Sequence, residues 1–264
     1  MKLPTRIVEK PWGRTDIPAA FGDFGERRIG EIWFEHPDGD AAPLMVKFLF
    51  TSERLSIQVH PDDAAAQAYG YARGKEECWL VLDTTPDAEL GVGLVRDSSV
   101  DELRASAEAG TIERLIDWRE AAPGDFVYNS AGTIHAIGPG LTVVEVQQNV
   151  DLTYRLYDYG RPRELHLDAG LAVARTVTHS DPRDRSAPAS GTLTLVDGPK
   201  FHLIRAEGPL DTSGWPTSEF TVTPLGAGCA VDGELIAYGE CAITSDANSI
   251  DLQPGALALI AWSA

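Results

Sequence analysis

The chain has 264 residues, which is enough for one large domain or two of moderate size. Its formal net charge of -18 argues against nucleic acids and anionic membranes as partners, because their phosphates would repel it. The N-terminal segment has no apolar core typical of a secretion signal, and no run is long enough to span a bilayer, so neither feature is expected.

The three cysteines, Cys78, Cys229 and Cys241, are an odd number and show no CxxC spacing. This pattern predicts reduced thiols in a cytoplasmic protein rather than a disulfide framework or a cysteine-based zinc site. The oligomeric state is not indicated by the sequence.

Short apolar, β-branched segments separated by glycine and proline are the dominant pattern of the chain to residue 148. They are 29–35, 44–50, 55–60, 77–83, 125–129, 133–138 and 141–148. This pattern predicts an all-β sandwich or barrel.

Helix is expected in two places only. Residues 61–74 can form a helix that opens on Asp62 or Asp63 as N-cap, and residues 97–118 one that opens on Ser98 or Ser99 ahead of Glu102. The fold class is therefore all-β with minor helix.

Residues 178–191 are polar, contain two prolines and have no hydrophobic periodicity, so they are predicted to be a linker between domains 1–177 and 192–264. A short repeat supports this boundary. Pro123-Gly124 and Pro254-Gly255 each precede a strand-like run, and the position equivalent to His135 would fall beyond Ala264. The second β-domain is therefore expected to be a degenerate copy without metal ligands.

Four polar side chains in strand-like segments are candidate metal ligands. Gln58 and His60 lie two residues apart and point to the same side of a strand; on these residues alone, a solvent-facing strand is the favoured explanation. Glu77 begins an otherwise apolar strand, and His135 lies between apolar neighbours. Two imidazoles, a carboxylate and an amide together predict a metal site, which by ligand type suits zinc and also Fe(II).

Two motifs resemble those of the cupin superfamily. Residues 124–135 fit the pattern G-x5-P-x-G-x2-H with Ser130 in place of the proline, and Gln58-x-His60 followed by Glu77 resembles the first cupin motif with glutamine as its first ligand. Together with 29–35 and 145–166, they occur in the order found in type I mannose-6-phosphate isomerases of the short bacterial form. The resemblance covers roughly residues 6 to 175, as judged from motif order.

The resemblance implies a cupin β-barrel or jelly roll that binds one zinc ion per chain through Gln58, His60, Glu77 and His135. It also implies a reaction that interconverts mannose 6-phosphate and fructose 6-phosphate through an enediolate. One anionic and three neutral ligands would leave about one unit of positive charge on a divalent ion, whereas structural zinc sites usually neutralise it with thiolates.

Glu145 is the candidate base for moving a proton between C1 and C2 of the sugar. Residues 135–148 are predicted to form a hairpin that turns near Pro139, which would place Glu145 a residue or two from the cross-strand neighbour of His135. The alternative is that Glu145 forms an internal salt bridge with Arg155.

Four residues are candidates for binding the substrate phosphate. Lys75 and Arg155 resemble the catalytic and phosphate-handling positions of the family, and Arg163 and Ser56 are further candidates. Lys75 and Arg163 can alternatively be solvated surface charges.

Two residues depart from the family pattern near these motifs: Ser130, and Val150 where serine commonly precedes aspartate. They leave open an isomerase of a different phosphosugar. The same donor set is also compatible with a phosphosugar-binding cupin without catalysis and with an Fe(II) oxygenase.

Overall fold

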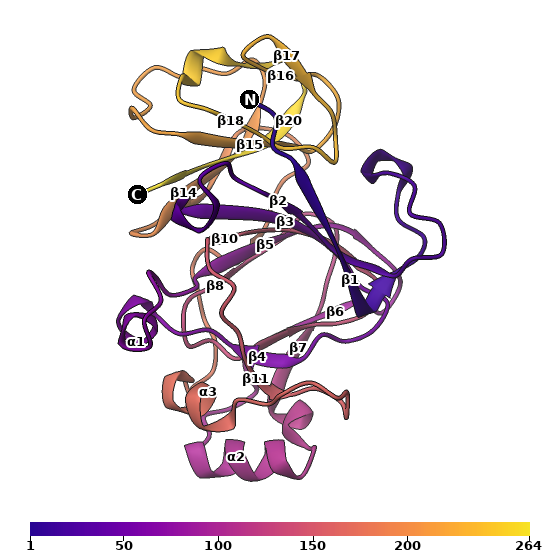
Figure 1. Cartoon of the computed structure of the whole chain (residues 1–264), viewed down its shortest axis with the longest axis vertical. Helices are drawn as coiled ribbons and strands as arrows, with labels where there is room; N and C mark the ends of the chain where they lie inside the picture. Colours follow the sequence, from indigo (N-terminus) through magenta and orange to yellow (C-terminus); the bar gives the residue numbers. More distant parts are fainter.

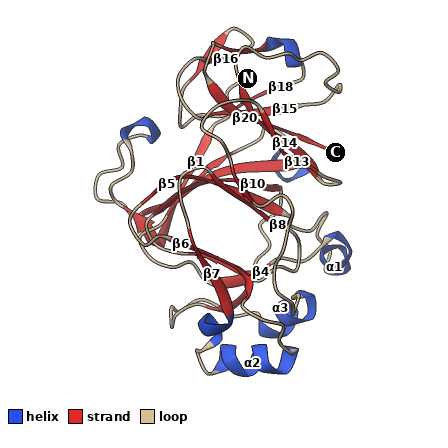
Figure 2. Cartoon of the chain, turned by 180° about the vertical axis from the view of Figure 1, so that it is seen from behind, coloured by secondary structure: helices blue, strands red, loops and turns tan.

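The computed structural model describes all residues, 1–264, and is built mainly of strands. The chain forms four layers: a C-terminal group of strands, a seven-stranded sheet, a five-stranded sheet and a layer of short helices (Figures 1 and 2). The two middle sheets face each other as the walls of a barrel, which Figure 1 shows nearly end-on. The prediction of an all-β fold with minor helix is confirmed.

Both barrel sheets are antiparallel. The seven-stranded sheet runs in the order β1 (Thr5–Arg14), β2 (Ile29–Phe34), β3 (Leu44–Phe50), β10 (Leu141–Gln148), β5 (Glu77–Thr84), β8 (Asp125–Asn129), β12 (Arg185–Ser186). The five-stranded sheet runs β11 (Tyr154–Tyr157), β4 (Ile57–Val59), β9 (His135–Ile137), β6 (Glu89–Leu94), β7 (Ile116–Glu120).

The C-terminal strands form two further sheets. One runs β13 (Leu193–Asp197), β14 (Phe201–Glu207), β20 (Leu257–Ser263), β15 (Phe220–Pro224), β18 (Ala242–Thr244), and the other β17 (Glu234–Ile236), β16 (Cys229–Val231), β19 (Ile250–Leu252). The glycines of the two Pro-Gly repeats, Gly124 and Gly255, both have positive φ and both precede a strand. The boundary at 178–191 stays a prediction; this segment contains β12, which pairs with β8.

Alternation along the strands separates the cores. Val144 and Val146 of β10 point outward into a core shared with C-terminal residues such as Phe201, whereas Glu145 lies on the opposite face, toward the barrel interior. Ile57 and Val59 likewise point outward, into the core beneath the helices. A third cluster, which includes Trp79 and Val143, fills the barrel interior.

The helices cover the outer face of the five-stranded sheet or lie at its rim (Figure 2). They are α1 (Asp63–Ala68), α2 (Val100–Glu108) and α3 (Leu167–Val173). Four short 3-10 turns occur elsewhere along the chain: η1 (Ala19–Phe21), η2 (Gly39–Ala41), η3 (Ile112–Leu115) and η4 (Ala247–Ser249). The side chains of Asp62 and Ser99 accept hydrogen bonds from the first turns of α1 and α2, which confirms one of the two N-cap candidates for each helix. None of the helices has the length and apolar character needed to cross a membrane.

The helix expected over 97–118 is shorter than predicted. α2 ends at Glu108, Gly110 takes a positive φ of 68°, and residues 116–120 form strand β7. The left-handed conformation at Gly110 ends the helix, after which Ile116 pairs with Leu94 of β6.

The hairpin predicted near Pro139 is wrong. β9 pairs with β4 and β6, whereas β10 pairs with β3 and β5, so the chain crosses from one barrel sheet to the other between them. The amides of Gly138 and Gly140 donate to the carbonyls of Glu89 and Thr51, which belong to neighbouring segments rather than to a two-stranded turn. A Cβ at Gly138 would lie 2.4 Å from the Glu89 oxygen, so this corner requires glycine.

Because the C-terminal sheets and the barrel share the core that contains Val144, Val146 and Phe201, we expect them to unfold together. Phe201 is fully buried in the cluster that joins them. We expect Phe201→Ala to lower the free energy of unfolding by about 3–5 kcal/mol, the usual cost of a large cavity. Denaturant unfolding followed by tryptophan fluorescence and circular dichroism measures this, with Leu235→Ala as control because Leu235 is 72% exposed. Two separate transitions in the wild type would contradict the expectation.

Candidate metal centre and substrate pocket

The site is built from two rows of side chains on the inner faces of the barrel sheets. In the five-stranded sheet, Gln58 of β4 is in register with Arg155 of β11 on one side and His135 of β9 on the other. In the seven-stranded sheet, Glu145 of β10 is in register with Lys47 of β3 and Trp79 of β5. Strand pairing therefore brings residues from distant parts of the chain into one barrel.

Three predicted ligands converge in the barrel interior. The ligand atoms of His60, Glu77 and His135 lie within 4.8 Å of one another, and all three side chains are buried. The Nδ1 atoms of His60 and His135 are each 2.9 Å from a backbone carbonyl, those of Leu152 and Thr133. These bonds direct both Nε2 atoms toward Glu77, at 3.4 and 3.3 Å from its oxygens, the arrangement that fixes histidine ligands in metal sites.

The fourth predicted ligand lies beside this cluster. The side-chain amide of Gln58 is 3.3 Å from Nε2 of His135 through its nitrogen, and its oxygen accepts a hydrogen bond of 3.1 Å from Ser56. Rotation of the amide by half a turn exchanges oxygen and nitrogen and presents the oxygen to the cluster. The structure thus brings all four predicted ligands together.

The charge of Glu77 is balanced by Lys75. Its carboxylate is fully buried and accepts no hydrogen bond of ordinary geometry, while the Lys75 ammonium forms an ion pair with it at 2.6 Å. Burial opposes ionisation of Glu77, but Lys75 and the two imidazoles outweigh it and hold the pKa of Glu77 well below its usual range. A buried carboxylate whose oxygens lack hydrogen bonds fits a divalent cation held with two imidazoles.

Both histidines are neutral, as metal coordination requires. Burial, together with the charge on Lys75, lowers the pKa of His60 to about 3, and burial also lowers the pKa of His135. Their rings lie 4.8 Å apart between centroids, and the indole of Trp79 packs edge-on against His135. The donor set is therefore one anion, two neutral imidazoles and a neutral amide.

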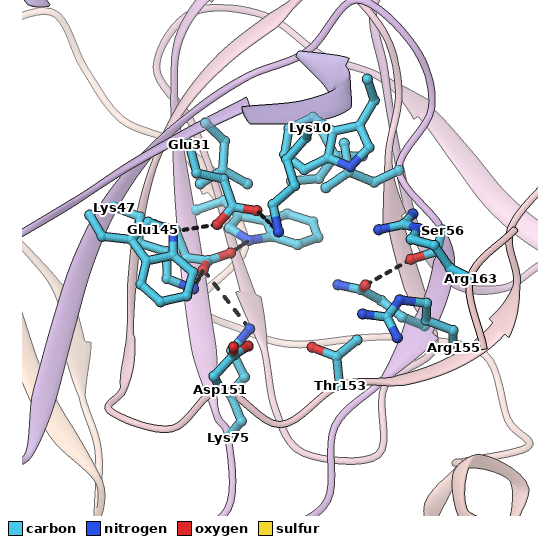
Figure 3. Close-up of a pocket in the computed structure, with 17 residues that line it drawn as sticks. Lys10, Glu31, Lys47, Ser56, Lys75, Glu145, Asp151, Thr153, Arg155 and Arg163 are labelled. Atoms are coloured by element: carbon cyan, nitrogen blue, oxygen red, sulfur yellow. Dashed lines mark hydrogen bonds and ion pairs between the residues drawn. The ribbon is translucent and has the colours of Figure 1, made fainter. Parts of the chain in front are cut away.

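A polar pocket opens above this cluster, and six of the predicted site residues line it: Ser56, Gln58, Lys75, Glu145, Arg155 and Arg163. His60, Glu77 and His135 do not line it. Gln58, Lys75 and Trp79 both contact the cluster and face the pocket. Figure 3 shows Ser56, Arg155 and Arg163 gathered on one side of the pocket, and Lys47, Lys75 and Glu145 on the other.

Glu145 has partners that differ from those expected from the sequence. Its oxygens accept a 3.0 Å hydrogen bond from the indole of Trp79 and lie 3.5 and 3.9 Å from the ammonium groups of Lys47 and Lys75. The alternative salt bridge with Arg155 does not form. Burial and the nearby charge of Glu77 raise the pKa of Glu145.

The two arginines of the pocket differ in their pairing. The side chain of Arg155 forms no hydrogen bond or ion pair with protein, whereas Arg163 is held by both oxygens of the buried carboxylate of Asp158, each at 2.6 Å. Arg155 is thus free to bind an anion, and Arg163 is fixed in orientation. Lys75 is 5% exposed, so the alternative of a solvated surface lysine is wrong.

Several pocket residues were not found from the sequence: Lys10, Glu31, Trp33, Lys47, Asp151 and Thr153. Lys47 is 5% exposed and Glu31 8%; Lys10 and Glu31 form an ion pair of 3.3 Å, and the Lys47 ammonium lies over the Trp33 ring. A signal was present, because Glu31 and Lys47 are single charges within otherwise apolar strand segments. Such a charge faces either solvent or a barrel interior, and periodicity does not distinguish the two.

The two departures from the family pattern do not line the pocket. Val150 packs against the core beneath the helices, and the hydroxyl of Ser130 accepts a 2.9 Å hydrogen bond from Arg175. Neither side chain is therefore placed to select among sugars by direct contact.

No protein-family model matches the chain. The mannose-6-phosphate isomerase of Streptococcus mutans is 31% identical over 244 residues, an alignment that covers 77% of this chain and 77% of that protein. Mannose-6-phosphate isomerase ManA of Bacillus subtilis is 40% identical over 158 residues, or 55% of this chain. The aligned parts span only 54% and 50% of the length of two Bacillus subtilis relatives.

Solved structures extend this likeness to the whole chain. The crystal structure of the mannose 6-phosphate isomerase from Bacillus subtilis superposes with a TM-score of 0.81 at 26% identity and covers 98% of both chains. This likeness confirms the predicted fold class, a cupin-like barrel with a further β-domain. The chain belongs to the mannose-6-phosphate isomerase family.

Proposed function

We propose that the chain interconverts mannose 6-phosphate and fructose 6-phosphate, with one zinc ion held by Gln58, His60, Glu77 and His135. The observation that carries the proposal is the convergence of two imidazoles and a buried carboxylate next to a pocket that contains an unpaired arginine; Gln58 and Lys75 connect the two. A solved relative is named as a zinc-bound mannose 6-phosphate isomerase, which supports zinc as the ion. A cytoplasmic location, inferred from the three cysteines, is part of the proposal.

The reaction moves a proton between C1 and C2 and generates negative charge on the sugar oxygens. When bound, zinc supplies a Lewis acid that stabilises this charge. Glu145 faces the pocket on the seven-stranded sheet, and in the proposal its carboxylate takes the proton from one carbon and returns it to the other. Lys75 lies between Glu145 and Glu77 and keeps a positive charge at the reacting end of the pocket.

The phosphate is proposed to bind on the opposite side of the pocket, at Arg155, Arg163 and Ser56 (Figure 3). Arg155 offers a planar fork for two phosphate oxygens, and Asp158 holds Arg163 in a fixed orientation. Because the net charge of the chain is -18, attraction of a dianionic substrate depends on these local cations.

An assay of zinc-loaded protein with mannose 6-phosphate, coupled to detection of fructose 6-phosphate, tests the proposal. We expect turnover in the range of about 1–10³ s⁻¹ typical of enzymes, and loss of it after chelation. Glucose 6-phosphate serves as the control substrate. Binding of mannose 6-phosphate without turnover, at one zinc per chain, would instead favour a phosphosugar-binding protein without catalysis.

A further inference from the structure

Residues 74–77, which lead into β5 and begin it, carry Lys75 and Glu77, and Asp63 connects them to the C-terminal sheets. Lys200, in the turn between β13 and β14, forms a 2.6 Å ion pair with Asp63 at the start of α1. We propose that Lys200 and Asp63 are positioning residues that hold this segment in place for metal binding and catalysis. The inference rests on the proposed function in that Lys75 and Glu77 are taken to act in the site.

Asp63 is the junction of the contact. While one of its oxygens binds Lys200, the other accepts hydrogen bonds from the backbone amide of Gly74, at 2.8 Å, and from the side chain of Gln148, at 3.0 Å. Gly74 immediately precedes Lys75. The carboxylate therefore ties a C-terminal residue to the backbone next to the site.

The segment is held closely on both sides. The side-chain oxygen of Gln148 accepts from the amide of Glu76, the backbone amide of Gln148 donates to the carbonyl of Glu76, and the amide of Lys75 donates to Pro61. A Cβ at Gly74 would lie 2.3 Å from the carbonyl carbon of Asp62, so only glycine permits this approach to the start of α1. Little freedom remains for Lys75 and Glu77 once Asp63 is fixed.

A second contact from the C-terminal sheets reaches the same segment. Phe201, the residue after Lys200, packs against Tyr128 of β8 with ring centroids 5.9 Å apart. The Tyr128 hydroxyl donates a hydrogen bond to the carboxylate of Glu76. The Lys200–Asp63 pair thus acts on the backbone at Gly74, and the Phe201–Tyr128 pair acts on the side chain of Glu76. Through these two routes the C-terminal sheets help to fix the geometry of the site.

Lys200→Met tests the inference, because it removes the charge from a residue whose side chain is 25% exposed and keeps most of its length. We expect the Gly74 amide to exchange its hydrogen about two- to fivefold faster and zinc to bind about two- to fivefold more weakly, the range for loss of a partly exposed ion pair. Asp63→Ala should weaken zinc binding by about tenfold, because it removes the acceptor of the Gly74 and Gln148 hydrogen bonds as well as the ion pair. In both variants kcat should fall more than KM rises.

Lys2→Met is the matched control. Lys2 forms a 2.9 Å ion pair with Glu240, with exposures of 33% and 35%, which also joins the N-terminus to the C-terminal sheets but does not contact residues 74–76. It should leave zinc affinity and Gly74 exchange unchanged. Lys200→Arg should behave as the wild type.

The double variant Asp63→Ala with Lys200→Met should be no weaker in zinc binding than Asp63→Ala alone, because Lys200 acts through Asp63. The inference would be overturned if the losses of zinc affinity caused by the two substitutions multiplied in the double variant. It would also be overturned if Lys200→Met and Lys2→Met had the same Gly74 amide exchange rate and the same zinc affinity. Zinc affinity and amide exchange are measured without substrate, so these tests remain decisive if the chain proves not to isomerise mannose 6-phosphate.

Discussion

Replacing His135 with alanine should abolish zinc binding while leaving the chain folded. Its imidazole is 1% exposed, and its Nε2 atom lies 3.3 Å from Glu77, so the substitution removes one of the three donors that converge there. We expect zinc affinity to fall by more than the ~10–100-fold loss typical of outer-shell partners, because a ligand itself is removed. Zinc content after dialysis, measured by atomic emission, gives the result directly.

Zinc should also affect the thermal stability of the wild type and of the His135→Ala variant differently. A ligand at a hundred times its dissociation constant stabilises the native state by about 2.7 kcal/mol, so zinc should raise the melting temperature of the wild type and not of His135→Ala. His36→Ala is the control, because His36 has a side chain only 9% exposed and a carboxylate partner, Glu219, outside the site. One zinc per chain retained by His135→Ala would show that His135 is not a ligand.

The face of each strand was predictable because side chains alternate along it. Gln58 and His60 were expected to share one side of their strand, and the apolar residues Ile57 and Val59 on the other side lie in an outer core. The order of the motifs and the types of donor were enough to select four candidate ligands from distant segments of the chain.

The pairing of strands was not predictable from the same pattern. Gly138, Pro139 and Gly140 are typical turn residues, and a hairpin between β9 and β10 is the simplest interpretation of them. The structure uses them to cross between sheets, so the strand partner of His135 is Gln58 and not a residue of β10. Alternation reports which face a residue is on, but not which strand lies beside it.

Although the hairpin predicted near Pro139 is wrong, Glu145 still lines the pocket. Glu145 and Glu77 lie on the seven-stranded sheet, whereas His135 lies on the five-stranded sheet. The strand neighbours of Glu145 are Lys47 and Trp79. Lys47 was not predicted as a partner of Glu145, because it is an isolated charge in an apolar segment. Whether such a charge faces solvent or the interior of a barrel can be decided only when the packing of the sheets is known.

Replacing Glu145 with glutamine should lower kcat by about 10²–10⁴-fold, the usual contribution of a general base, while one zinc per chain is retained. The amide has nearly the same shape and can still accept the hydrogen bond from Trp79, but it cannot take up a proton. Because Glu145 is not among the proposed ligands, the metal should stay. Coupled assays and zinc analysis on the same preparation measure both quantities.

Two further substitutions separate a base from a residue that only balances charge. Asp151→Asn tests the other candidate carboxylate, which lines the same pocket and forms no ion pair. Glu89→Gln is the control, because Glu89 pairs with Arg54 outside this pocket. If Asp151→Asn lost turnover while Glu145→Gln kept it, the base would be Asp151. If Glu145→Gln lost both turnover and zinc, Glu145 would be a residue that maintains the metal site and not the base. Its carboxylate lies 3.9 Å from the Lys75 ammonium, which pairs with Glu77.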